Sequence, residues 1–135
     1  MDWITTEVAI GNYIEARDEQ LQLQCRFNSV LCLDGKSATQ GNPDRERVVV
    51  KLEDGPGNDE RTFLRAVNEL LRLSQSHAPV FVHCHAGRSR SVVVVAAYLM
   101  KTRGLDAQEA FAQVADKREV AVTPGLLQLL ESVDP

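Results

Sequence analysis

The amino-acid sequence predicts an α/β fold in which a central, mainly parallel and twisted sheet is flanked by helices. Two observations support this prediction. Strand-like apolar runs alternate with segments of helical spacing, and the last run is continuously apolar, as expected of a central strand covered on both faces. The expected strands are residues 8–10, 27–33, 47–52 and 80–83. The segment after the last strand should lie at its carboxyl end, where open α/β sheets bind ligands.

Helices are expected between these strands. A short helix is predicted around residues 15–23. A longer one is predicted over 60–76, because its apolar residues recur at helical spacing after a candidate N-cap at Asn58 or Asp59. Residues 34–46 are rich in Gly, Ser, Thr, Asn, Asp and Pro, which predicts a long loop.

Three further helices are expected in the second half of the chain. Gly104 suits the C-terminal cap of the first, while Asp106 and Glu109 have the spacing of a capping box that opens the second. Thr123 and Pro124 supply an N-cap and a first-turn proline for the third. The expected bounds are 88–103, 106–117 and 123–132.

Composition indicates one globular domain over residues 1–135, with 44% hydrophobic and 25% charged residues. A net charge of −4 argues against a nucleic-acid partner. The longest apolar run, residues 92–100, is far shorter than the roughly 20 residues of a membrane span, so we expect a buried helix and no transmembrane segment.

The three cysteines form no even disulfide framework and no Cys-x-x-Cys pair, which favours a reducing compartment. The first residues lack the basic and apolar segments of a signal peptide. We therefore expect a cytoplasmic protein, and a monomer.

Residues 83–91, His-Cys-His-Ala-Gly-Arg-Ser-Arg-Ser, follow the predicted central strand and precede a helix. Backbone N–H groups here can surround a small anion, with Gly87 permitting close approach and the helix N-terminus adding free donors. Arg90 offers a planar pair of donors that matches phosphate oxygens. The predicted phosphate-binding residues are His85, Ala86, Gly87, Arg88, Ser89 and Arg90.

The same positive surroundings should favour the thiolate of Cys84, which would then be a nucleophile aimed at phosphorus. Ser91 can donate a hydrogen bond to the sulfur and stabilise it as a leaving group. His83 can order the loop by bonding to backbone carbonyls. A buried, inert thiol would account for Cys84 alone but not for the histidine, glycine, arginine and serine around it.

This run resembles the signature of the protein tyrosine phosphatase superfamily, His-Cys-x5-Arg-Ser/Thr. Residues 97–100, Ala-Tyr-Leu-Met, and the tail at 123–129 resemble the dual-specificity branch, with glycine and leucine where that tail carries asparagine and phenylalanine. The resemblance implies a dual-specificity phosphatase that cleaves phosphotyrosine and phosphoserine or phosphothreonine through a cysteinyl-phosphate, with no metal or other cofactor. It also implies a loop between the last central strand and a helix.

The resemblance further implies a general acid about thirty residues before the cysteine. Asp54 has this position, with Asp59 and Glu53 as competitors. The acid would protonate the leaving oxygen and then activate water. The glycines and proline at 55–57 would make its loop a mobile turn.

The substrate is left open between a phosphorylated protein, which is favoured, and a phosphorylated lipid or inositol. Phosphoinositide 3-phosphatases and the mitochondrial phosphatidylglycerophosphate phosphatase carry basic residues at the places of His85 and Arg88, where cations favour a polyanion. Alternatively, Arg88 pairs with an acidic neighbour and His85 packs sideways. An inactive module that binds phosphorylated partners and a rhodanese-type sulfur transferase are the remaining alternatives.

Cys25 and Cys32 are expected to be packing thiols. The alternative for Cys32 is a protective disulfide with Cys84 on oxidation, as some relatives form.

Overall fold

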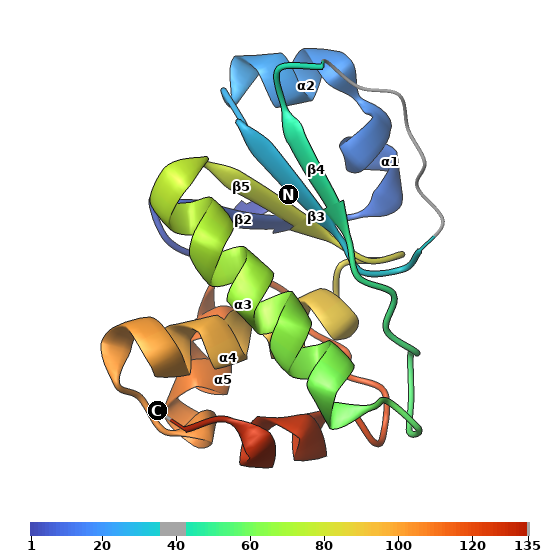
Figure 1. Ribbon diagram of the computed structural model, residues 1–135, viewed down its shortest axis with the longest axis vertical. Helices are drawn as coiled ribbons and strands as arrows, with labels where there is room; N and C mark the ends of the chain where they lie inside the picture. The colour runs from blue at the N-terminus through green and yellow to red at the C-terminus, as the bar shows by residue number, and fades with distance from the viewer. Residues whose placement is uncertain (36–42, 135) are drawn as a thin grey trace.

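The computed structural model describes residues 1–35 and 43–134 (Figure 1). Within them, five strands form one sheet in the order β1-β2-β5-β3-β4. The first strand pairs antiparallel with the second, and all other neighbours are parallel, which confirms the predicted mainly parallel sheet. The strands are β1 Asp2–Trp3, β2 Val8–Gly11, β3 Ser29–Cys32, β4 Glu46–Val49 and β5 Val80–His83.

Helices cover both faces of the sheet, with α1 and α2 on one side and α3, α4 and α5 on the other (Figure 1). The larger core lies on the side of α3 and α4, and the smaller one lies beneath α1. The helices are α1 Tyr13–Arg17, α2 Glu19–Gln24, α3 Glu60–Ser76, α4 Arg90–Arg103, α5 Ala107–Lys117 and the 3₁₀ helix η1 Leu127–Ser132.

Strand β5 is central and fully buried, as predicted from its continuous apolar run. Its side chains alternate between the two faces. Val80 and Val82 join the larger core, whereas Phe81 joins the smaller one with Phe27. Because β5 is held by β2 on one side and β3 on the other, the segment that follows it begins from a fixed point.

The helix caps predicted from neighbouring residues in the sequence are confirmed for three helices. The α3 bounds match the prediction, with Asp59 rather than Asn58 at the N-cap. Helix α4 ends at Gly104, whose φ of 65° is left-handed, and residues 92–100 are buried as expected. Asp106 and Glu109 form the predicted capping box of α5.

Two helix predictions are wrong. The single helix expected at 15–23 is two short helices, because Asp18 has extended backbone and its side chain accepts from the Leu21 N–H, which starts α2. The last helix does not begin at Thr123. Gly125 adopts a φ of 99°, which a right-handed helix cannot include, and η1 starts only at Leu127.

The strand predictions are right in place and imprecise in length. The second and third expected strands are shorter than predicted, although hydrogen bonds from Val50 N to Cys32 O and from Leu52 N to Leu33 O continue the pairing beyond β4. The edge strand β1 was not predicted. Most of the loop expected at 34–46 lies outside the described residues, and its last residue, Glu46, begins β4.

Candidate active site

The loop of residues 84–89 joins the end of β5 to the start of α4. Cys84 is buried, with 2% of its surface exposed, while His85, Ala86 and Arg88 are exposed. The loop borders a cavity of about 290 Å³, which Asp54 reaches from the segment after β4. The lining residues are Asp54, Cys84, His85, Ala86, Arg88, Ser89, Arg90 and Ala121.

Each backbone carbonyl of this loop accepts a hydrogen bond from another group of the protein. His85 O accepts from Tyr13 N at 2.9 Å, and Arg88 O accepts from Ala121 N at 2.9 Å. Arg118 donates to the carbonyls of Ala86 and Gly87. Within the described residues, the N–H groups of residues 85–89 donate to no protein acceptor. The loop therefore offers a row of unused donors, the arrangement that binds small anions.

Gly87 is required where it stands. Its φ is +71°, and an added Cβ would collide with the carbonyl oxygen of Gly11 and lie 2.8 Å from Nη2 of Arg118. The loop thus rests directly on the end of β2, an approach that a side chain would prevent.

Arg90 lies at the first position of α4 and is half-buried. Its Nη1 donates to Leu52 O at 3.2 Å, which ties the loop to the segment that carries Asp54. Its Nε is buried without a hydrogen-bond partner among the described residues. A guanidinium held through one nitrogen keeps its other donors for a ligand in the cavity.

Ser91 does not form the predicted hydrogen bond to the Cys84 sulfur in this structure. Its side chain is fully buried in the first turn of α4, and its Oγ has no partner among the described residues. A buried hydroxyl without a partner is costly, so this donor remains available to a charge that develops nearby.

His83 is buried at the end of β5, and its Nδ1 donates to the carbonyl of Cys84 at 3.1 Å, in the tautomer that places a proton there. Burial lowers the pKa of the His83 imidazole below its ordinary value. This hydrogen bond gives the Cys84 carbonyl a donor within the protein.

The segment that carries Asp54 is hydrogen-bonded to the amide side chain of Asn58. Asn58 accepts from Glu53 N at 2.7 Å and donates to the carbonyls of Glu53 and Gly55 at 2.8 and 3.1 Å. On the other side, Gly125 packs against Pro56 so closely that a Cβ would be 2.7 Å from its nitrogen. The turn predicted to be mobile thus has hydrogen bonds at Gly55 and close packing at Pro56 in this structure.

Of the three competing carboxylates, Asp54 is the one that lines the cavity. Asp59 caps α3, where it accepts from Arg61 N and from the Thr62 hydroxyl. The Glu53 side chain is exposed and does not line the cavity.

His85 and Arg88 both line the cavity and both have protein contacts at its rim. The His85 ring stacks on the Tyr13 ring, with centroids 4.4 Å apart. The Arg17 guanidinium lies over the same Tyr13 ring, 5.5 Å from its centroid. Arg88 faces Glu119 at 3.7 Å, an exposed pair that adds little stability. The sideways packing and the acidic neighbour weighed from the sequence are both present.

A buried polar cluster lies next to the loop. The Cys32 thiol donates to Asp34 at 3.1 Å, and a ring nitrogen of His83 lies within 4.8 Å of both side chains. Thiol, carboxylate and imidazole are the donor types that bind zinc, and here the thiol donates a hydrogen bond to the carboxylate. All three cysteines are free thiols, so the Cys32–Cys84 disulfide stays a prediction.

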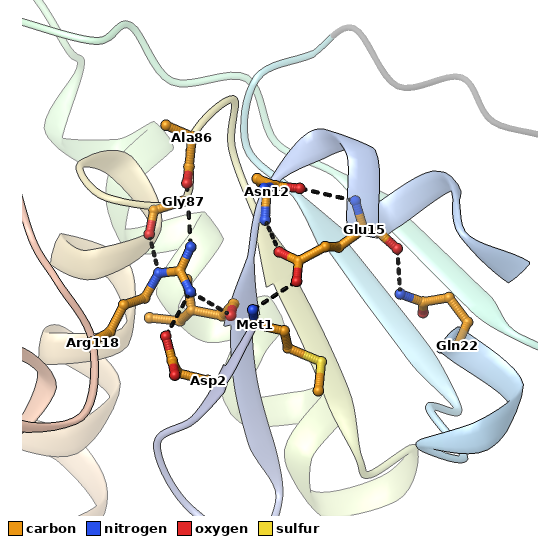
Figure 2. Close-up of polar contacts among 9 residues, drawn as sticks. Met1, Asp2, Asn12, Glu15, Gln22, Ala86, Gly87 and Arg118 are labelled. Carbon is orange, nitrogen blue, oxygen red and sulfur yellow. Dashed lines mark hydrogen bonds and ion pairs between the residues drawn. The ribbon is translucent and has the colours of Figure 1, made fainter. Parts of the chain in front are cut away.

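Sequence reasoning missed Arg118, the residue that follows α5. Figure 2 shows its guanidinium between the loop and the N-terminal strand, with bonds to Gly87, Ala86 and Asp2. No local motif marks this arginine, because its partners lie about 31 positions or more away in the chain. Ser89 has a similar distant partner, since its hydroxyl bonds both the backbone and the hydroxyl of Thr123.

No helix in the described ranges, 1–35 and 43–134, has the length and apolar character needed to cross a membrane.

Residues 8–132 match a family model described as the catalytic domain of dual specificity phosphatases. Among curated relatives, the yvh1 tyrosine-protein phosphatase of Schizosaccharomyces pombe is 34% identical over 77 residues, covering 56% of this chain and 23% of that one. Dual specificity protein phosphatase 1B of Arabidopsis thaliana is 28% identical over 127 residues, covering 93% and 76%. The chain spans from 14% to 52% of the length of the first four curated relatives.

Solved structures share the fold over nearly the whole chain. Human DUSP28 superposes with a TM-score of 0.87 at 23% identity, covering 96% of this chain and 90% of that one. A mouse putative dual specificity phosphatase, in complex with zinc tungstate, gives a TM-score of 0.86 at 25% identity and covers 96% and 83%.

Proposed function

Since the chain belongs to the dual-specificity phosphatase family, we propose that it hydrolyses phosphomonoesters on phosphorylated tyrosine and serine or threonine residues of proteins. One observation supports this most strongly: the loop after β5 presents a buried cysteine and a row of unused N–H donors to a cavity that also receives a carboxylate. We further propose that residues 1–135 act as a single catalytic domain.

In the proposed first step, the phosphoryl group lies in the loop, bound by the N–H groups of residues 85–89 and by Arg90. The Cys84 thiolate attacks phosphorus and forms a P–S bond. The bond from phosphorus to the ester oxygen breaks, and Asp54 gives its proton to that oxygen, so that the leaving group departs as a neutral alcohol or phenol.

In the second step, a water molecule attacks the phosphorus of the cysteinyl-phosphate, and the Asp54 carboxylate takes a proton from that water molecule. The P–S bond breaks, inorganic phosphate leaves and the thiolate is restored. The unpartnered Ser91 hydroxyl is suited to donate a hydrogen bond to the sulfur as its negative charge develops. Each proton is returned by the end of the cycle, and the mechanism requires no metal.

Replacing Asp54 by asparagine should lower kcat by about a hundredfold or more on a phosphothreonine peptide, and less on p-nitrophenyl phosphate, whose phenolate leaves without protonation. Steady-state kinetics on the two substrates measures both losses.

Glu53→Gln is the matched control, because Glu53 is adjacent and exposed but does not line the cavity. If Glu53→Gln reproduced the loss and Asp54→Asn did not, the acid would be assigned to the wrong carboxylate.

A phospholipid or phosphoinositide phosphatase is the second candidate, supported by the two basic side chains, His85 and Arg88, at the rim of the cavity. Protein substrates are favoured because His85 is stacked on Tyr13 and Arg88 faces Glu119, so both side chains already have protein contacts.

Turnover should be compared on phosphotyrosine and phosphothreonine peptides, phosphoinositides in mixed micelles and phosphatidylglycerophosphate. We expect the peptides to have the higher kcat/KM, and Arg88→Ala to change the peptide values by less than about tenfold. Higher kcat/KM on a lipid, with a selective loss of lipid turnover in Arg88→Ala, would favour the second candidate.

A further inference from the structure

We propose that Arg118 is a positioning residue that holds the loop after β5 in the conformation that binds an anion. This inference rests on the proposed function for its catalytic consequence, but not for its prediction about anion binding. Arg118 lies outside the loop and does not line the cavity, so it contacts the backbone of the loop rather than the space that an anion would fill.

Only 9% of the Arg118 side-chain surface is exposed, and each nitrogen of its guanidinium has an acceptor. Nε donates to Gly87 O at 2.6 Å and Nη2 to Ala86 O at 3.2 Å. Nη1 donates to Ile10 O at 3.2 Å and pairs with a carboxylate oxygen of Asp2 at 2.9 Å. Figure 2 shows the Ala86 and Gly87 carbonyls directed toward this group.

These contacts determine where the loop donors point. In a planar trans peptide, the carbonyl and the following N–H point in opposite directions. When Arg118 holds the carbonyls of Ala86 and Gly87, the N–H groups of Gly87 and Arg88 must therefore face the other way. Both belong to the row of donors with no protein acceptor.

The shape of the guanidinium matters as well as its charge. A single planar group reaches two successive carbonyls and a strand carbonyl at once, a set of directions that an ammonium on a flexible chain cannot match. The loop is adapted to it, because a Cβ on Gly87 would lie 2.8 Å from Nη2. Arg118 also brings a positive charge beneath the anion site, which Asp2 partly balances.

A purely structural role is the competing explanation, since Arg118 also joins α5 to β1 and β2. Arg45 is the matched control for that explanation. Its side chain is 3% exposed, its Nε donates to Phe27 O at 3.0 Å, and it forms a two-pronged pair with Glu19, all away from the loop. Replacing Arg45 removes another arginine with little exposed side-chain surface, without altering the donors of the loop.

The experiment measures tungstate binding by calorimetry, p-nitrophenyl phosphate kinetics and the melting temperature for wild type, Arg118→Ala, Arg118→Lys and Arg45→Ala. We expect Arg118→Ala and Arg118→Lys to weaken tungstate binding by about tenfold or more and to lower kcat by up to about a hundredfold. Arg45→Ala should lower the melting temperature while tungstate affinity stays within about twofold of wild type.

Equal tungstate affinity in Arg118→Lys and wild type would overturn the proposal, because the positive charge alone would then suffice. Wild-type affinity in a folded Arg118→Ala would overturn it as well. If Arg118→Ala does not fold, the lysine variant decides. If the wild type binds tungstate but hydrolyses no phosphomonoester, the proposed function fails, while the affinities of the variants still test Arg118.

Discussion

Replacing Cys84 by serine is expected to abolish hydrolysis of p-nitrophenyl phosphate, with a fall in kcat of at least about 10⁴-fold. The substitution exchanges one atom at a buried position, so the fold should be retained. A neutral serine hydroxyl attacks phosphorus far more slowly than a thiolate does. The assay contains EDTA, so that any metal-dependent contaminant is silent.

Cys25→Ser is the control for this variant. Cys25 is half-buried at the end of α2, away from the cavity, and its replacement should leave kcat within about twofold of wild type. Activity in Cys84→Ser equal to that of wild type would remove Cys84 from the mechanism.

Arg90→Lys is expected to have the next largest effect, with a fall in kcat/KM of about a hundredfold to a thousandfold. Lysine keeps the charge, but it loses the planar pair of donors and the contact that Nη1 makes with Leu52 O. The effect should appear in kcat as well as in KM, because the paired guanidinium donors match the equatorial oxygens of the phosphoryl group best in the transition state.

Arg65→Lys is the matched control, because Arg65 is an exposed arginine on α3 that also donates to one backbone carbonyl, Val49 O. Arg65→Lys should leave kcat and KM unchanged. A loss confined to KM in Arg90→Lys would mean that the arginine only binds substrate.

The parts of the fold that could be predicted from the sequence are those with local causes. Helix α3 has its cap and its apolar spacing within one segment, and α5 carries both halves of its capping box. The errors arose where a single residue overrides a pattern. Asp18 divides one expected helix into two, and Gly125 delays the last helix, because backbone angles at one position are not visible in periodicity.

In the candidate site, too, the features with local causes could be predicted and those that depend on distant contacts could not. The spacing in residues 83–91 suffices to place Cys84 and Arg90 beside one cavity, because they are close in the chain. Arg118 could not be predicted, since it reaches Gly87 only through the packing of α5 against α4. Likewise, the sequence could not show that Asp59 is occupied as a helix cap while Asp54 faces the cavity.

The most direct measurement for this account is the identification of the residue that carries phosphate during turnover. Wild-type protein is mixed with p-nitrophenyl phosphate, quenched within milliseconds, digested and analysed by mass spectrometry under conditions that preserve both phosphocysteine and phosphohistidine. We expect phosphate on Cys84, and none in Cys84→Ser. Phosphate on His83 or His85, or steady turnover with no phosphorylated residue, would contradict the cysteinyl-phosphate mechanism.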